Sequence, residues 1–264
     1  MVVCYGVVDS ATMSALEMYD TPRLNPLVRT PSRRVAILVA LWIATLAVAA
    51  LWLDGPVARW AYRAAIDRDH PGNHVLKMTG DWRFTLAVAL ALLVWHRQTW
   101  QAAGLLALSA LTGGLLYSLC KWTVGRQRPV VLIDPLAFSP FRSGWAGLFD
   151  EPNLSFPSGH TCLAFATAAC LGICIPRWKY LFYALGLFVA GERVAENAHY
   201  LSDVIGGAGL GTLSAYLTFW IANRVIPWDR EKAAPREAAE APQAEQGAPG
   251  EAQSFAAVGA RVPS

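Results

Sequence analysis

The sequence predicts an all-α membrane protein, a bundle of six transmembrane helices. The first observation is composition, because 55% of the 264 residues are apolar and only 16% are charged. Soluble domains carry about 25% charged residues. The second observation is that three apolar blocks, 35–53, 102–120 and 204–223, run for 19, 19 and 20 residues without a charge. Runs of about 18 such residues are typical of membrane spans.

Three shorter apolar blocks lie among the long ones, at residues 84–95, 161–176 and 180–191. Each is short enough, taken alone, to be a helix in the core of a soluble domain. Beside three clear spans, we expect them to cross the membrane as well, lengthened by the residues that flank them. Six spans would place both ends of the chain on the same side of the membrane.

The connection between the first two spans contains an amphipathic segment. Val57, Trp60 and Ala61 recur at helical spacing, while Arg59 and Arg63 fall on the opposite face. This pattern predicts a short helix that lies in the membrane interface. An ordinary amphipathic connector, with no role at the membrane surface, is the alternative.

The two ends of the chain differ from its apolar middle. The chain from Glu231 onward is rich in Ala, Glu, Pro and Gln, and a segment of that composition buries too little apolar surface to fold. We therefore expect three parts: an N-terminal cytoplasmic segment at 1–34, a membrane domain at 35–226 and a disordered cytoplasmic tail at 227–264.

The charges of the short connections orient the predicted bundle. The stretches HRQ at 96–98 and PRWK at 176–179 carry basic residues and no acidic ones, and they share a side with Arg33, Arg34 and Arg224. The positive-inside rule places that side in the cytoplasm. A net charge of +3, with no basic patch interleaved with aromatic residues, gives no support for binding to nucleic acid.

Three polar clusters lie at predicted helix ends on the other, extracytoplasmic side: KWTVGRQRP at 121–129, PSGH at 157–160 and RVAENAHYLSD at 193–203. They contain the cations Lys121, Arg128 and Arg193, which lie at the edge of the hydrocarbon, where burial is unfavourable without an anion. Few acidic neighbours match them, and guanidinium groups suit phosphate oxygens, so we expect an anion site. Taken singly, each cation could instead snorkel to lipid head groups.

Ser158 and Gly159 directly precede the apolar run that begins at Thr161. The start of a helix offers unbonded N–H groups and a positive dipole end, both of which favour an anion. Gly159 would let the backbone approach a phosphate closely. Ser158 is also a residue type that caps helices, and that is the alternative role for it.

Two histidines complete the candidate site. His199 and Asp203 are four residues apart, so on a helix they share a face. A carboxylate bonded to one ring nitrogen fixes the tautomer and leaves the other nitrogen to attack. His160, at the opposite end of the anion site, would donate a proton to a leaving oxygen. A single histidine at a membrane interface is usually structural, but two with these neighbours indicate catalysis.

The three clusters together resemble the type 2 phosphatidic acid phosphatase superfamily of membrane lipid phosphatases. The first cluster matches K-x6-R-P through Lys121, Arg128 and Pro129, and the second matches P-S-G-H. The third matches R-x5-H-x3-D through Arg193, His199 and Asp203. The resemblance covers residues 80–225, and three motifs in this order are highly specific.

The resemblance implies an integral membrane hydrolase that acts on a lipid phosphate or polyprenyl pyrophosphate without a metal or cofactor. By resemblance, His199 is the nucleophile and forms a phosphohistidine, Asp203 orients it, and His160 protonates the leaving group. The residues implied to hold the phosphate are Lys121, Arg128, Ser158, Gly159 and Arg193. A bacterial inner membrane, with the active site on the extracytoplasmic face, is the expected location.

One position departs from the family pattern, because Glu192 stands where the third motif usually has a serine. A carboxylate there would repel phosphate, so we expect Glu192 to turn away or to pair with an arginine. Three other functions are possible alternatives for these motifs. A lipid phosphotransferase would use the same site, and a lipid-binding or transport relative would have a weak one. A vanadium-dependent haloperoxidase, which is soluble, is disfavoured by the long apolar runs.

Overall fold

The computed structural model describes residues 33–64, 78–95, 100–129, 134–141, 144 and 153–225. Within these residues every extended regular element is a helix, and β-pairing is limited to two isolated bridges. The predicted tail, 227–264, lies outside the described residues, as does nearly all of the predicted N-terminal segment. The expected all-α fold is confirmed.

Six long helices correspond to the six predicted spans. They are α2 (Arg33–Val48), which continues through the π-helical η2 (Ala49–Leu53), and then α5 (Trp82–Trp95), α6 (Trp100–Val124), α7 (Gly159–Cys174), α8 (Lys179–Ala195) and α9 (Leu201–Val225). Three helical stretches are long and apolar enough to cross a membrane, namely Val35–Ala64, α6 and α9. The helices α5 and α7 are apolar but shorter.

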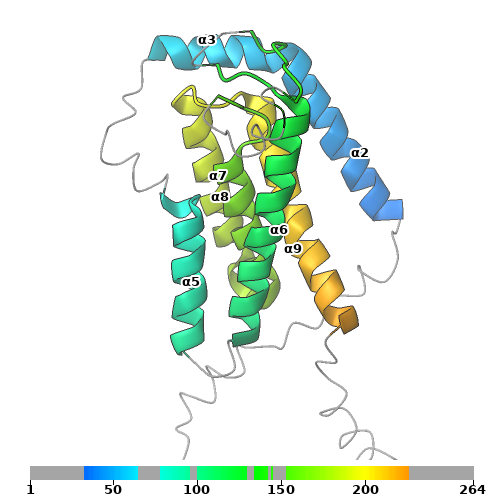
Figure 1. Cartoon of the computed structure of the whole chain (residues 1–264), viewed down its shortest axis with the longest axis vertical. Helices are drawn as coiled ribbons and strands as arrows, with labels where there is room; N and C mark the ends of the chain where they lie inside the picture. Colours follow the sequence, from blue (N-terminus) through cyan, green and yellow to red (C-terminus); the bar gives the residue numbers. More distant parts are fainter. Residues whose placement is uncertain are drawn as a thin grey trace, which may run out of the picture. The chain divides into compact units, whose positions relative to one another are not determined.

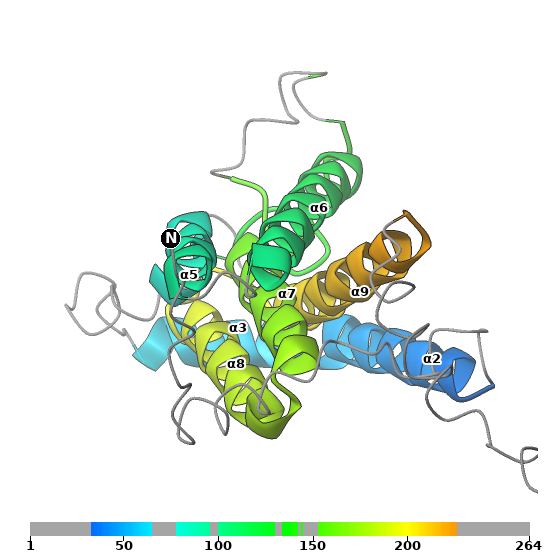
Figure 2. The ribbon, with the colours of Figure 1, turned by 90° about the horizontal axis from the view of Figure 1, so that it is seen from below.

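Helix α7 lies at the centre of the bundle, with α5, α6, α8 and α9 arranged around it (Figure 2). Every residue from Thr161 to Cys170 is buried. Helix α9 packs closely because it presents glycines to α7: a Cβ atom on Gly211 would lie 2.0 Å from the Cys162 carbonyl oxygen, and one on Gly207 would lie 2.6 Å from that of Ser158. This small-residue contact holds the first turn of α7 against the second and third turns of α9.

Helix α3 (Asp54–Ala64) lies across one end of the bundle (Figure 1). The predicted short helix is therefore present. Asp54, Ala58 and Ala61 are buried, whereas Trp60 is 59% exposed. The Asp54 carboxylate pairs with Arg126, which is also buried, at 2.7 Å.

Helix α6 ends at a glycine that turns the chain back over the bundle. Gly125 has a φ of +63°, and a Cβ atom there would lie 2.0 Å from the Ser139 carbonyl oxygen, so only glycine fits. The residues after it pair with two other loop segments, through bridges between Arg126 and Phe138 and between Gln127 and Leu154. The basic residues of the first cluster are thereby fixed in place.

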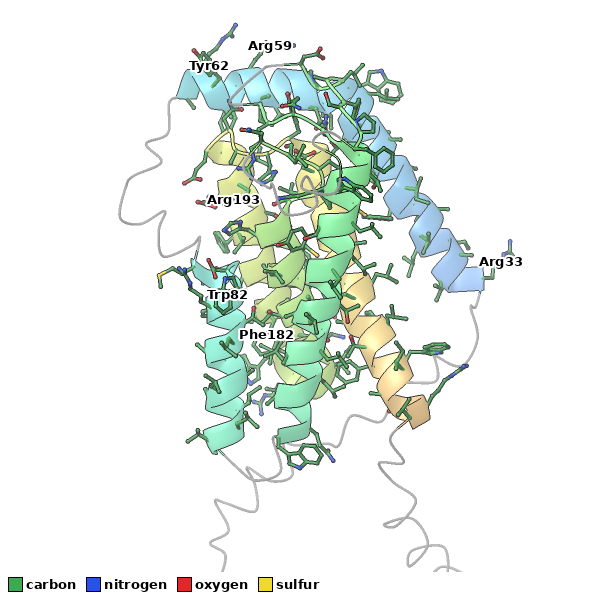
Figure 3. The ribbon with its side chains drawn as sticks, in the orientation of Figure 1. Arg33, Arg59, Tyr62, Trp82, Phe182 and Arg193 are labelled. Carbon is green, nitrogen blue, oxygen red and sulfur yellow. The ribbon has the colours of Figure 1, made fainter. Side chains whose placement is uncertain are left out.

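All three polar clusters lie at the end of the bundle that α3 covers. In Figure 1 the carboxyl ends of α6 and α8 and the amino ends of α7 and α9 lie beneath α3. Figure 3 shows Arg193 in this region, below α3, whereas Arg59 and Tyr62 on α3 point away from the bundle. The topology brings together residues that are far apart in the sequence, as the six-span arrangement predicts.

Candidate active site

Backbone hydrogen bonds join the three clusters directly. The Ser158 N–H donates to the Asp203 carbonyl oxygen at 3.0 Å, and the Ser155 N–H donates to the Arg126 carbonyl oxygen at 2.7 Å. The segment 155–160, which includes PSGH, is therefore bonded to the first cluster on one side and to the third cluster on the other. Main-chain bonds of this kind fix the spacing between the clusters independently of side-chain rotamers.

His199 and Asp203 lie together, as the sequence predicts, although His199 is in the turn before α9 rather than on the helix. The His199 Nδ1 atom is 3.7 Å from Asp203 Oδ2. The Ser155 hydroxyl donates to the same carboxylate oxygen and lies 3.4 Å from Nδ1. Because Nδ1 faces these oxygens, Nε2 is the nitrogen left for attack on a substrate.

The electrostatic surroundings keep His199 neutral at pH 7. Burial lowers the pKa of its imidazole to about 4, because the interior disfavours the charged form, and the positive charges of Arg128 and Lys121 act in the same direction. The Asp203 carboxylate acts in the opposite direction but does not outweigh burial. A neutral imidazole is the form that can act as a nucleophile.

His160 is the second residue of α7 and lies in the same site. The charges of Arg193, Asp81 and Lys121 all act on its imidazole, and Lys121 acts on His199 as well. The segment before α5 packs against it, because a Cβ atom on Gly80 would lie 3.0 Å from the His160 carbonyl oxygen. The two histidines thus belong to one electrostatic environment at one end of the bundle.

Lys121 lies in the last turn of α6, where the helix dipole favours a cation, and it is only 4% exposed. Its Nζ atom is 5.4 Å from the centre of the Tyr117 ring. That ring also packs on Gly159, where a Cβ atom would lie 3.2 Å from Tyr117 Cε2. Gly159 therefore leaves room for the ring that holds Lys121; its predicted contact with a phosphate stays a prediction.

Ser158 and Arg128 have protein partners in the structure. Ser158 is the N-cap of α7: its Oγ atom accepts from the Thr161 N–H at 3.4 Å and is 3.0 Å from Thr161 Oγ1. This is the capping role that the sequence offers as the alternative. Arg128, which is half-buried, donates from Nε to the Leu154 carbonyl oxygen at 3.2 Å. Phosphate binding by either residue stays a prediction.

Arg193 is held by two acidic residues of its own helix turn. Its Nε and Nη2 atoms donate to the two carboxylate oxygens of Glu192, each at 2.6 Å, and Nη2 also donates to Glu196. The expected pairing of Glu192 with an arginine is confirmed. Within the described part of the chain Nη1 makes no hydrogen bond, so one edge of the guanidinium is left for a further acceptor.

Sequence reasoning did not identify Arg126, Ser155 or Asp54 as part of the site. The Asp203 carboxylate accepts from Arg126 Nη1 at 2.7 Å and from the Ser155 hydroxyl. Asp54 accepts from Arg126 Nη2 at 2.7 Å. The available signal was weak: Arg126 lies in the first basic cluster and Ser155 adjoins PSGH, but the spacing does not say which side chains face inward.

Known proteins of similar sequence include membrane phosphatases. Residues 102–227 match the family model described as PAP2 superfamily. Over 107 residues the chain is 39% identical to a Lipid A 1-phosphatase of Rhizobium etli, covering 40% of this chain and 44% of that protein. Over 133 residues it is 26% identical to an Undecaprenyl-diphosphatase of Sulfolobus acidocaldarius, covering 50% and 60%. The matches therefore span less than two thirds of each of these relatives.

The fold has a counterpart among solved structures. A transmembrane PAP2-type phosphatidylglycerolphosphate phosphatase from Bacillus subtilis superposes with a TM-score of 0.51, covering 74% of this chain and 98% of that one. The sequence identity is 22%, so this likeness concerns the fold. Residues 102–227 of this membrane protein thus match the PAP2 superfamily model, and its fold is that of a PAP2-type membrane phosphatase.

Proposed function

We propose that this protein is an integral membrane phosphatase that hydrolyses a lipid phosphate or pyrophosphate through a phosphohistidine, without a metal. The observation that carries the proposal is the environment of His199. Its neutral imidazole has Nδ1 turned toward Asp203, and the charges of Lys121 and Arg128 act on it. A poised nucleophile among cations is the arrangement that phosphoryl transfer requires.

In the first step Nε2 of His199 attacks the phosphorus of the lipid phosphate. A P–N bond forms as the P–O bond to the leaving group breaks, and the leaving oxygen takes a proton from His160, whose protonated form the bound phosphate dianion favours. The Nδ1 proton of His199 is held by the Asp203 carboxylate and the Ser155 hydroxyl, which stabilise the positive charge that develops on the ring. The products are a phosphorylated His199 and the free lipid alcohol, or a lipid monophosphate when the substrate is a pyrophosphate.

In the second step a water molecule replaces the leaving group. His160, now neutral, takes a proton from the water as its oxygen attacks the phosphorus. The P–N bond breaks, inorganic phosphate leaves, and His199 returns to its neutral form. Over the cycle His160 gives one proton to the leaving oxygen and regains one from water, His199 keeps its Nδ1 proton, and no external acid or base is consumed.

The cations act on the charge spread over the phosphate oxygens. In this proposal Lys121, Arg128 and Arg193 stabilise the transition state, as Mg²⁺ does in other phosphoryl-transfer enzymes. The N–H groups at the start of α7, beside Ser158 and Gly159, add hydrogen-bond donors and the positive end of a helix dipole. Positioning and electrostatic stabilisation supply most of the rate acceleration in such reactions.

The position of the site suggests the class of substrate. The site lies at helix ends, where a phosphate head group would be reached from the membrane surface while its tail stays in lipid. Relatives named Lipid A 1-phosphatase and Undecaprenyl-diphosphatase support a saccharolipid phosphate or a polyprenyl diphosphate. We propose a bacterial inner membrane and an extracytoplasmic active site, on the basis of the charges in the short connections.

The test is phosphate release by the purified protein in detergent micelles. The panel holds lipid A, undecaprenyl diphosphate, phosphatidate and phosphatidylglycerol phosphate, each assayed with and without EDTA. We expect release from at least one lipid, unchanged by EDTA and blocked by vanadate, which mimics five-coordinate phosphorus. Loss of turnover in EDTA that Mg²⁺ restores would contradict the metal-free mechanism. His199→Ala is the matched inactive control.

Two alternative functions give different results in the same assay. A phosphotransferase would consume the lipid phosphate and release less inorganic phosphate when a lipid alcohol is added, because the phosphoryl group moves to the alcohol. A lipid-binding or transport relative would release none from any lipid. The pairing of Glu192 with Arg193 favours the second alternative over the first, since it occupies a predicted phosphate ligand.

A further inference from the structure

The guanidinium of Arg126 donates five hydrogen bonds within the site. Its Nη1 atom donates to Ser202 Oγ at 2.6 Å and to Asp203 Oδ1 at 2.7 Å. Its Nη2 atom donates to Asp54 Oδ2 and to the Pro135 carbonyl oxygen, both at 2.7 Å, and Nε donates to the same carbonyl at 3.0 Å. A guanidinium has five N–H groups, and all five are used. Arg126 therefore has no donor left for a phosphate.

Asp54 is the fully buried partner on the other side of this arginine. It is the first residue of α3, outside the family-matched segment. Besides the Arg126 bond, it accepts from the Ser202 N–H at 2.9 Å and from the Ser202 hydroxyl. The Ser202 N–H belongs to the first turn of α9, so Asp54 caps that helix from a distant segment. The Asp54 side chain is 0% exposed, so these hydrogen bonds are shielded from solvent.

Asp54 and Asp203 thus share one guanidinium through different nitrogens. Asp203 has its Oδ1 atom on Arg126 and its Oδ2 atom toward Ser155 and His199. Arg126 holds the Oδ1 end of this carboxylate, while the Tyr200 N–H and the Ser155 hydroxyl hold the Oδ2 end that faces the histidine. The position of Arg126 is fixed in turn by Asp54, because Asp54 is the anion that holds the Nη2 end of the guanidinium.

We propose that Asp54 is a positioning residue for catalysis, which acts through Arg126 and Ser202 to aim Asp203 at His199. This inference rests on the proposed phosphatase function, in which Asp203 orients the nucleophile. Asp54 touches neither His199 nor the predicted phosphate ligands. Its loss should therefore slow the chemical step and leave substrate binding unchanged, whereas a purely structural contact would alter neither parameter in a folded protein.

The test compares Asp54→Asn with Asp134→Asn in phosphate release from the best lipid substrate. At position 54 an amide places an N–H group against a donor, Ser202 N or Arg126 Nη2, in a site of the same shape. Asp134 is an exposed residue of the segment after α6, and its Oδ1 atom accepts from the Leu136 N–H, which an asparagine can also do. The two variants therefore carry the same chemical change, buried in one and exposed in the other.

We expect kcat of Asp54→Asn to fall about tenfold or more, the scale seen when the hydrogen-bond partners behind metal-binding histidines are removed. KM and the inhibition constant of inorganic phosphate should stay within about twofold of the wild-type values, because the phosphate ligands are untouched. Asp134→Asn should behave as the wild type. An unchanged kcat in a folded Asp54→Asn protein, or a fall matched by a rise in KM, would overturn the inference.

Ser202→Ala keeps the test decisive if Asp54→Asn does not fold. It removes one acceptor from Arg126 and one donor from Asp54 while it leaves all the charges in place, so kcat should fall less, by about threefold, at constant KM. An unchanged kcat in this variant, or the loss of folding in both variants, would overturn the inference. A wild-type protein that releases phosphate from no lipid would instead refute the proposed function itself.

Discussion

Two buried arginines of this site are each held by two carboxylates, yet they differ in where those carboxylates come from. Arg126 lies between Asp54 and Asp203, which belong to α3 and α9. Arg193 is bonded to Glu192 and Glu196, which are its neighbours along the chain. The first arginine joins distant segments, and the second closes a contact within one helix turn.

Because of this difference, Arg126 is held in one position, whereas Arg193 can change its anionic partner. All five N–H groups of Arg126 are bonded, so moving it would break contacts between several elements at once. Arg193 keeps Nη1 without a hydrogen bond in the described residues, and its two acidic partners hold no other element through it. A phosphate could therefore compete with Glu192 for Arg193 without disturbing the bundle.

The largest expected effect is on the Arg126 side. Asp203→Asn should lower kcat by about 10³- to 10⁴-fold, the loss seen when an aspartate that orients a catalytic histidine becomes an asparagine. KM should change little, since Asp203 does not contact the phosphate. Steady-state kinetics on one lipid substrate measure both parameters. A variant that retained more than a tenth of the wild-type kcat would remove Asp203 from the mechanism.

On the Arg193 side, Arg193→Lys should lower kcat/KM by about 10²-fold, the scale for one lost donor to a developing oxyanion. Lysine keeps the charge but not the planar fork, so a loss of this size would show that the fork contacts the transition state. Arg193→Ala serves as the matched variant without charge. Wild-type kcat/KM in Arg193→Lys would mean that this arginine is only a structural partner of the two glutamates.

The pKa of His199 also tests the Arg126 side of the site, because the Asp203 carboxylate that faces this histidine is paired with Arg126. Burial lowers the pKa of His199 from an ordinary value of 6.5 to about 4. The histidine should therefore bind a proton with a midpoint near pH 4, measured by NMR of labelled imidazoles with His199→Ala as the assignment control. The unfolded chain binds this proton more readily between pH 6.5 and 4, so stability should fall as the pH falls through that range. A midpoint near 6.5 would contradict the buried, neutral nucleophile.

The smallest expected effect comes from removing the carboxylate of Glu192, which pairs with Arg193. Glu192→Ser installs the residue that the family usually has, and it should lower KM by about threefold because phosphate no longer competes with a bonded carboxylate. Glu192→Gln, which removes the charge but keeps the shape, should act in the same direction. The measurement is KM at low ionic strength. A higher KM in both variants would show that Glu192 holds Arg193 in the binding position.

The sequence predicted the fold and the gathering of the clusters because both follow from local features. Long apolar runs specify the helices, and the alternation of spans places 121–129, 157–160 and 193–203 at one end. The motif spacing also identified His199 and Asp203 as neighbours. These predictions need only helix length, chain direction and residue type.

The partners of each side chain were not predictable in the same way. Nothing in the spacing distinguishes Arg126 from Arg128, two residues apart, although one faces Asp203 and the other bonds to Leu154. Asp54 is separated from Ser202 by 148 residues, and no local pattern reports such a contact.

The most direct test of the proposed mechanism is to trap the phosphoenzyme. Wild-type protein would be mixed with a ³²P-labelled lipid phosphate and quenched within one turnover. We predict a labelled protein whose phosphate is stable in alkali and lost in acid, as a phosphohistidine is, located at His199 by mass spectrometry and absent from His199→Ala. Full turnover with no labelled intermediate, or a label that persists in His199→Ala, would contradict nucleophilic catalysis by this histidine.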